Sequence, residues 1–470
     1  MNIKHLPEPA SIFEKIWQLS PDKHLPEAYA MLLQLTKKLI SIYDAEGRLD
    51  ENPFTPTTKR KLNLQVNKIQ SMLRNSTCLV TGGSGCVGST LVRRLLEMGA
   101  GKIIIVDLID NCSSARSAHE NVITVLTDVS DRDALNNVFE EYQPEYVFHT
   151  AAQRDPGYAE NHIEETVNLN VLGTLNLVNA CESHKSVKQC VFSSTGKASR
   201  YYTNEVYAAT KKMCEYIFDT YALQSSVRYS MVRFTHILEN SLMNTELQNP
   251  LHADYMAIHS PGKYVTAQNV CEAADLMLNA LLNSKIGNCN FLIVKNLEWP
   301  VESLEVALYY IKQSGAKIPI IFKGNPPGYS EKFFRGQMDW AHPLDMNLLI
   351  NVYEQRYKYE NDEGDIMISR IVPTNKYILQ NALIKLSLVK GEKKSKECLL
   401  LQLKNIVRAT LNNVKQSDTV NILQWGLNPH YLATEGTIAA DYEPAVSILN
   451  ESLNPHNSSN SAIYGQYINC

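Results

Sequence analysis

The stretch Cys78–Asp107, CLVTGGSGCVGSTLVRRLLEMGAGKIIIVD, decides how the rest of the chain is interpreted. It holds a short apolar run, a glycine loop, a helical pattern and a second apolar run that ends at Asp107. Gly82, Gly85 and Gly88 would let the backbone approach a pyrophosphate at a helix N-terminus, where free N–H groups bind anions. A carboxylate about 20 residues after the loop is placed to bind the adenosine ribose. The stretch therefore predicts a dinucleotide-binding unit.

The residue at the end of the second apolar run also bears on the choice of dinucleotide. The Asp107 carboxylate would repel a 2′-phosphate, and no arginine follows it directly. Arg116, nine residues further on, falls in a predicted loop. The sequence therefore favours NAD over NADP.

The composition limits the function classes. The 470 residues are 44% hydrophobic and 20% charged, with a net charge of −4, so neither nucleic acid nor a membrane surface is expected as a partner. Ten scattered cysteines without a Cys-x-x-Cys pair favour a reducing compartment and argue against structural zinc or a disulfide framework, and no metal site is expected. No segment has the pattern of a signal peptide or a membrane span, so we expect a cytoplasmic protein.

Strand and helix patterns alternate from Cys78 to about Arg233, which predicts an α/β fold with a doubly wound parallel sheet. We expect three consecutive parts. Residues 1–75 form a helical extension, with one helix from Pro26 and another over 57–74. Residues 76–342 form the nucleotide-binding domain, in which about 235–342 build a smaller substrate lobe. Residues 343–470 form a mainly helical extension with helices at 376–389 and 397–414, a solvated charged loop at 390–396 and a disordered tail.

A second motif carries the predicted chemistry. Tyr207 and Lys211 lie four residues apart, so on a helix they share one face. An ammonium beside a phenol would lower the pKa of the phenol and suit it to moving a proton on and off a substrate hydroxyl. Ser194 and Thr195 end a predicted strand at the sheet edge where ligands bind, so a hydroxyl there could hold the same substrate oxygen.

Taken together, the motifs resemble the extended short-chain dehydrogenase/reductases, and within them the nucleotide-sugar dehydratases and epimerases of capsule and polysaccharide biosynthesis. The resemblance covers about Cys78 to Trp340 and implies a Rossmann fold. The matching segments are TGGSGCVG (81–88), VFHTAAQRDP (147–156), NLNVLGTLNLVNAC (168–181), VFSSTGKAS (191–199), YAATKK (207–212) and VRF (232–234), with weaker matches at 263–281 and 326–332.

The resemblance implies roles for individual residues. Those expected to contact the cofactor are Gly82, Gly85, Cys86, Val87, Gly88, Asp107, Asp128, Val129, Ala151, Ala152, Tyr207 and Lys211. Thr195, Tyr207 and Lys211 would form the catalytic triad, and Lys197 would be the base at the sugar C5. The scheme implied is oxidation of a C4 hydroxyl on a nucleotide-activated sugar by recycled NAD. Family members also commonly dimerise through the helices holding Asn170–Cys181 and Tyr207–Ala222, so a homodimer is expected.

Departures from the family pattern fall on the substrate side. Gly196 stands where 4,6-dehydratases carry the aspartate that protonates the leaving hydroxyl, so epimerisation or internal redox is favoured over dehydration. His236 replaces an asparagine that faces the sugar nucleotide, and it is either a substrate contact or structural. Arg154 could bind a phosphate or carboxylate, or pair with Asp155 in a loop. His149, within an apolar run, is interpreted as a hydrogen-bonded core histidine.

Three functions remain open at this point. The first is the NAD-dependent oxidoreductase or epimerase acting on a nucleotide sugar. The second is an NAD(P)-dependent dehydrogenase or ketoreductase acting on a non-sugar metabolite, which the altered substrate loop favours. The third is a catalytically silent dinucleotide-binding scaffold, against which the intact Thr195, Tyr207 and Lys211 argue.

Overall fold

The computed structural model of the 470-residue chain describes residues 8–109, 120–240, 247–329, 332–338 and 347–453. Arg116, Glu331, Trp340 and the tail predicted to be disordered lie outside the described residues. The chain divides into two units. The smaller unit comprises 1–61, 235–272 and 297–326, and the larger comprises 62–234, 273–296 and 327–470. The predicted division into three consecutive parts stays a prediction.

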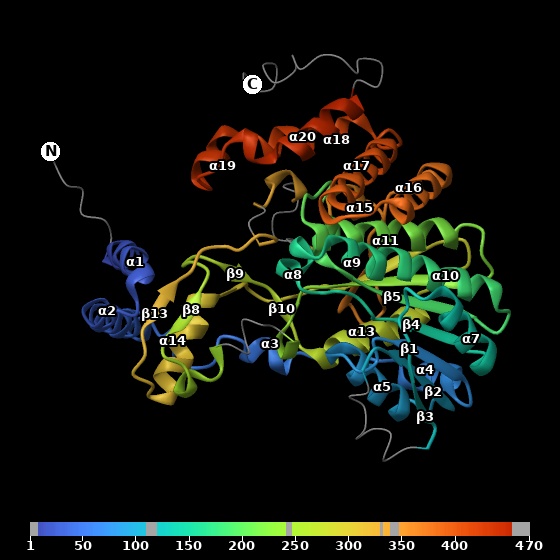
Figure 1. Ribbon diagram of the computed structural model, residues 1–470, viewed down its shortest axis with the longest axis horizontal. Coiled ribbons are helices and arrows are strands. Elements are labelled where there is room, and N and C mark those ends of the chain that lie inside the picture. The colour runs from blue at the N-terminus through green and yellow to red at the C-terminus, as the bar shows by residue number, and fades with distance from the viewer. Residues whose placement is uncertain (1–7, 110–119, 241–246, 330–331, 339–346, 454–470) are drawn as a thin grey trace. The chain divides into compact units, whose positions relative to one another are not determined.

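A nine-stranded sheet, counted over the described residues, forms the centre of the larger unit (Figure 1). Its strand order is β14-β15-β11-β6-β5-β4-β1-β2-β3. All neighbours from β11 to β3 are parallel, whereas β15 and β14 are antiparallel to their neighbours. The strands are β1 (Thr77–Thr81), β2 (Lys102–Asp107), β3 (Val122–Leu126), β4 (Tyr146–His149), β5 (Gln189–Thr195), β6 (Arg228–Phe234), β11 (Asn290–Val294), β14 (Tyr359–Glu360) and β15 (Ile366–Arg370).

Helices connect and cover these strands, and this alternation confirms the predicted doubly wound α/β fold. The central strands are almost fully buried, as strands with helices on both faces must be. The helices in this part are α4 (Val66–Leu73), α5 (Cys86–Glu97), α7 (Arg132–Tyr142), α8 (Pro156–Asn161), α9 (Ile163–Val167), a π-helical turn (Asn168–Leu172), α10 (Gly173–Ser183), a 3-10 turn (Gly196–Ser199), α11 (Val206–Ala222) and α13 (Val270–Leu282), the last of which begins in the smaller unit.

The C-terminal segment belongs to the same unit and differs from its prediction. It contributes two strands to the sheet, and α17 begins at Glu392, so most of the predicted charged loop is helical. Strand β15 was not predicted, although its short apolar run follows a turn in which Gly364 has φ +74°. The helices are α15 (Val352–Gln355), α16 (Lys376–Leu388), α17 (Glu392–Leu411), α18 (Gln416–Gly426), α19 (Pro429–Thr434) and α20 (Glu443–Leu453), with 3-10 turns at Arg335–Gln337 and Ala439–Tyr442.

Helices α16 and α17 pack on α11 (Figure 1). All residues of α11 except Tyr207 and Tyr221 are buried. Helices α16 and α17 therefore cover part of the α11 face that was expected to meet a second copy. The homodimer stays a prediction.

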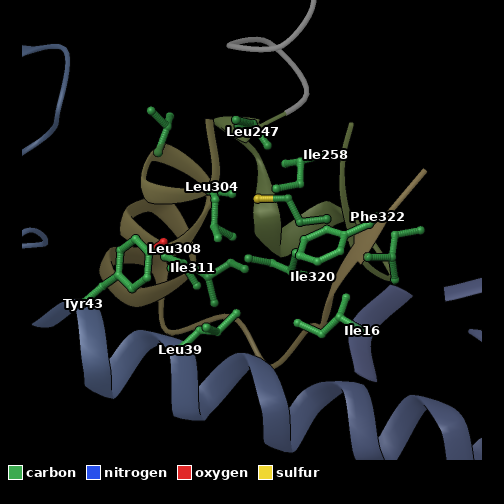
Figure 2. Packing of buried hydrophobic residues seen from close by; sticks show 14 of the residues in the cluster. Ile16, Leu39, Tyr43, Leu247, Ile258, Leu304, Leu308, Ile311, Ile320 and Phe322 are labelled. Atoms are coloured by element: carbon green, nitrogen blue, oxygen red, sulfur yellow. The ribbon is translucent and has the colours of Figure 1, made fainter. Parts of the chain in front are cut away.

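Within its described residues, the smaller unit contains the N-terminal helices and three two-stranded sheets. Its core joins α1, α2 and α14 to β8 and β13, as Figure 2 shows for residues such as Leu39, Leu308 and Phe322. The predicted helix over 57–74 is interrupted, because residues 60–65 are not helical. The elements are α1 (Glu8–Leu19), a 3-10 turn (Ser20–Asp22), α2 (Pro26–Ala45), α3 (Thr55–Lys59), β7 (His236–Ile237), 3-10 turns at Leu238–Asn240 and Pro250–His252, β8 (Met256–Ile258), β9 (Tyr264–Val265), β10 (Ala267–Gln268), β12 (Val301–Glu302), α14 (Ser303–Ser314) and β13 (Ile320–Phe322).

None of the helices in the described part of the chain is both long and apolar enough to cross a lipid bilayer.

Candidate active site

The loop between β1 and α5 requires glycine for steric reasons. Gly82 has φ +69°, and a Cβ atom there would lie 2.6 Å from the backbone nitrogen of Ala151. A Cβ atom at Gly88 would lie 2.1 Å from the Gly82 carbonyl oxygen. Gly85 directly precedes α5, which begins with Cys86 and Val87. The loop therefore leaves bare backbone at a helix N-terminus, as the binding of a pyrophosphate requires.

Asp107 lies at the end of β2, next to this loop. Its carboxylate accepts hydrogen bonds from the backbone N–H of Ser84 at 2.9 Å and of Leu108 at 2.8 Å. The carboxylate is thus held beside the glycine loop, at the position that the ribose prediction needs.

A hollow of about 430 Å³ adjoins the ends of β2 and β3. Asp128 lines it, whereas Val129 is buried and packs against Gly173. One wall comes from Glu392 of α17, which the sequence analysis missed because nothing local signals such a distant partner. The lining residues are Leu108, Asp128, Ser130, Glu164, Glu165, Asn168, Leu169 and Glu392.

Thr195 and Tyr207 meet at the carboxyl ends of the strands. Thr195 ends β5, and Tyr207 lies in the first turn of α11. Burial raises the pKa of Tyr207 to about 12, while a hydrogen bond with the Thr195 hydroxyl and the positive charge of Arg154 oppose that rise. The structure therefore brings three predicted residues, Thr195, Tyr207 and Arg154, together.

Lys211, on the same helix as Tyr207, is buried and has a backbone acceptor. Its ammonium donates to the Ser193 carbonyl oxygen at 2.8 Å and lies 4.6 Å from the centroid of the Phe192 ring. Burial lowers the pKa of Lys211 to about 8. Its predicted effect on the pKa of Tyr207 stays a prediction.

Ser194 belongs to a buried charge network. Its hydroxyl donates to Glu215 at 2.6 Å, and Glu215 in turn accepts two hydrogen bonds from Arg233. Arg233 is fully buried, and its other side binds Glu354 of the C-terminal segment through two 2.7 Å contacts. Ser194 therefore faces the interior, which corrects its predicted role as a substrate contact.

The turn after β5 explains the departure at Gly196. A Cβ atom at Gly196 would lie 2.1 Å from Cδ2 of the buried Leu349, so the C-terminal segment fills the space that an aspartate would need. The next residue, Lys197, donates to Glu205 at 2.7 Å and to the Gly328 carbonyl oxygen at 3.3 Å. Its predicted action as a base stays a prediction.

The segment after β4 is fixed by a residue whose role the sequence analysis missed. Asn170, in the π-helical turn, accepts from the Gln153 N–H at 2.8 Å and donates to the Thr210 hydroxyl at 3.0 Å. It thereby ties the Ala151–Ala152 loop to α11. Such π-helical turns are frequent at functional sites, but no local sequence pattern distinguishes them.

The remaining predicted polar residues divide between the units. Asp155 caps α8 by accepting from Gly157 at 2.8 Å. His149 is fully buried between the Thr81 and Thr174 hydroxyls, and burial lowers its pKa to about 3, so its interpretation as a core histidine is confirmed. His236 is exposed on β7 of the smaller unit, and its contact with substrate stays a prediction.

The sheet order, the glycine loop and the Thr195–Tyr207 pair define a nucleotide-binding α/β protein of the extended short-chain dehydrogenase/reductase type. The family model described as "Polysaccharide biosynthesis protein" matches residues 78–329. The chain therefore belongs to this polysaccharide biosynthesis family, and the predicted resemblance is confirmed.

Individual relatives agree with this assignment. The probable polysaccharide biosynthesis protein EpsC of Bacillus subtilis is 26% identical over 320 residues, which cover 65% of this chain and 51% of EpsC. A dTDP-glucose 4,6-dehydratase of Haemophilus influenzae is 30% identical over 134 residues, 27% of this chain and 40% of the relative. The chain spans about half the length of the curated polysaccharide biosynthesis proteins that it matches.

A solved structure is similar in fold. The X-ray structure of Pen from Bacillus thuringiensis superposes with a TM-score of 0.54 at 19% identity, covering 65% of this chain and 90% of Pen. At this level of identity the likeness concerns the fold alone.

Proposed function

We propose that the chain is an NAD-dependent enzyme that oxidises a hydroxyl of a nucleotide-activated sugar, with epimerisation or internal redox as the outcome. The observation that carries the proposal is that Thr195 at the end of β5 and Tyr207 in the first turn of α11 lie in the unit whose β1 leads into the glycine loop and α5. Membership of the polysaccharide biosynthesis family and a relative named as a dTDP-glucose 4,6-dehydratase support the sugar nucleotide as substrate class.

The residues present fit NAD. The close approach of bare backbone at Gly82 and Gly88 suits a pyrophosphate, Asp107 suits a ribose without a 2′-phosphate, and the adjoining hollow suits the adenine end. When bound, NAD would supply the acceptor for a hydride and a positive charge near the phenol. The adjoining Leu108 and Asp128 would line the adenine.

The side chain of Tyr207 would transfer the proton of the substrate hydroxyl. With a pKa of about 12, Tyr207 is a neutral phenol at pH 7, held by the Thr195 hydroxyl and facing the charge of Arg154. Any further positive charge beside it would lower this pKa towards the range in which it accepts a proton from a hydroxyl. Thr195 would hold the same substrate oxygen, and Lys197 would serve at C5.

The packing of Gly196 against Leu349 argues against 4,6-dehydration by this chain. Elimination of the C6 hydroxyl needs an acid to protonate the leaving group, and no acidic side chain fits at position 196 without repacking Leu349. Retention of the C6 hydroxyl is therefore the expected outcome.

The test is a screen of UDP- and dTDP-sugars with NAD, followed by NMR of the products. Tyr207→Phe should abolish turnover and leave NAD affinity within about twofold, because the phenol acts in proton transfer. Lys197→Ala should lose exchange of the C5 hydrogen with solvent deuterium but keep hydride transfer. Binding of NAD with turnover of a non-sugar alcohol alone would favour the dehydrogenase alternative. Full turnover by Tyr207→Phe would contradict the mechanism.

A further inference from the structure

The first turn of α17 lies outside the residues that match the family, yet Glu392 in this turn lines the hollow of the candidate site. Two of its side chains, one helical turn apart, reach α8 and α9. Glu392 accepts hydrogen bonds from the backbone N–H groups of Ile163 and Glu164. Lys396 donates to Oε2 of Glu160 at 2.6 Å.

Glu160 also contacts the N-terminus of α11. Its second oxygen, Oε1, accepts a hydrogen bond of 2.8 Å from the backbone N–H of Val206, the first residue of α11. Tyr207 is the next residue. The free N–H groups of a helix N-terminus need acceptors, so Glu160 satisfies one of them directly before the phenol.

The Glu160 carboxylate depends on its lysine. The Glu160 side chain is only 8% exposed, whereas that of Lys396 is 36% exposed. A carboxylate that is nearly buried and loses its cationic partner either takes up a proton or turns towards solvent. Either change weakens the acceptor for the Val206 N–H, because a neutral carboxyl is a poorer acceptor than a carboxylate.

From these contacts we propose that Lys396, acting through Glu160, is a positioning residue for Tyr207. The proposal rests on the proposed function for the role of Tyr207 as the group that moves the proton. The helix added after the family domain thereby sets the geometry of the first turn of α11. A displacement of about 1 Å at a reacting group can cost about 100-fold in rate, so a loosened first turn would slow the chemical step.

The experiment compares Lys396→Met with Lys394→Met in the full chain. Lys394 lies in the same helical turn and is exposed, so its variant controls for loss of a lysine from α17. In Lys396→Met, hydrogen–deuterium exchange of the Val206 amide should be at least ~10-fold faster than in the control. With the sugar nucleotide turned over by the wild type, kcat should fall by roughly 10–100-fold with KM little changed. Lys396→Arg should restore both.

A double variant tests the order of action. Glu160→Ala should lower kcat at least as much as Lys396→Met, and the combined variant should be no slower than Glu160→Ala alone, because the lysine acts only through the carboxylate. Additive losses would overturn the proposal. Melting temperatures close to that of Lys394→Met would show that the losses are local.

The outcomes separate the two proposals. Exchange at Val206 equal to that of the Lys394→Met control overturns the role of Lys396, whether or not the protein turns over a sugar nucleotide. Faster exchange with unchanged kcat also overturns it and leaves the proposed function standing. If the wild type turns over no sugar nucleotide, the proposed function fails. The exchange rate of the Val206 amide in Lys396→Met, compared with the Lys394→Met control, still decides whether Lys396 orders this turn.

Discussion

The two ends of the candidate site are held in place by different means. At the glycine loop, Gly82 and Gly88 bring backbone against backbone within one short stretch of sequence. At the catalytic end, β5, β6 and α11 are held by Arg233, whose partner Glu354 lies 121 residues away. The glycine loop depends on residues close in sequence that have no side chains. The catalytic end depends on buried charges that pair over long sequence distances. Substitutions should therefore damage the two ends in different ways.

Replacing the central arginine should have the largest effect. Arg233→Met would leave Glu215 and Glu354 buried without their cation, and we expect the free energy of unfolding to fall by about 3–5 kcal/mol. Urea unfolding followed by tryptophan fluorescence measures this. Arg228→Met, on the same strand but exposed, is the matched control and should change stability by less than about 0.5 kcal/mol. Equal effects would contradict the importance of the buried pairing.

At the other end, Gly82→Ala should harm both stability and binding of NAD. The new methyl would press on the Ala151 backbone, which we expect to cost about 1–3 kcal/mol of stability and at least ~10-fold in NAD affinity. Gly99→Ala has the same kind of positive φ but no atom within 4 Å of the new Cβ, so it isolates the strain of the backbone. Titration calorimetry with NAD checks the affinity, and similar losses in both variants would contradict a role for the close approach.

The buried carboxyl group of Asp219 should make the stability of the larger unit depend on pH. Burial raises the pKa of Asp219 on α11 to about 7, against the opposing charge of Arg370. The unfolded chain releases this proton near pH 4, so between pH 4 and 7 the folded state binds more protons. Stability should therefore fall as pH rises through this window, by up to about 1.4 kcal/mol per pH unit.

Asp219→Asn should remove that dependence. Unfolding measured at intervals from pH 4 to 8 in the wild type and in Asp219→Asn gives the difference directly, and Asp133→Asn serves as an exposed control. A difference that grows with pH up to about 7 and is then constant is expected. A difference independent of pH would contradict a raised pKa for Asp219.

The smallest expected effect concerns Ser194. Ser194→Ala removes one hydrogen bond to a carboxylate that keeps Arg233 as a partner, so we expect a loss of about 1 kcal/mol in stability. Because the side chain faces the interior, the KM for a sugar nucleotide should change by less than about twofold, whereas Thr195→Ala should lower kcat. A large rise in KM for Ser194→Ala would restore its predicted contact with substrate.

The sequence predicted best what is built locally. The glycine loop, Asp107 at the end of a strand and the strand–helix alternation of a parallel sheet follow from short patterns whose backbone geometry is nearly obligatory. His149 could also be interpreted correctly, because a histidine within a continuous apolar run has few alternatives to a hydrogen-bonded core position.

The sequence could not show which distant segments complete the catalytic end. Arginine and glutamate usually lie on the surface of a protein. Only the fold shows that Arg233 pairs with Glu215 and Glu354 in the interior. The setting of Lys211 shows the same limit. Spacing along a helix places two residues on one face, but it does not show that the side chain of Lys211 donates to the Ser193 carbonyl oxygen.

Strand β15 has a practical consequence for shortening the chain. It pairs antiparallel with β11 over five residues and comes after residue 329, where the family match ends. A polypeptide terminated at that point would leave β11 as an edge strand with unpaired backbone N–H and C=O groups. These groups can pair with strands of other copies, so we expect the shortened polypeptide to aggregate. The end of the family match is therefore not the place at which we expect the chain to be divisible.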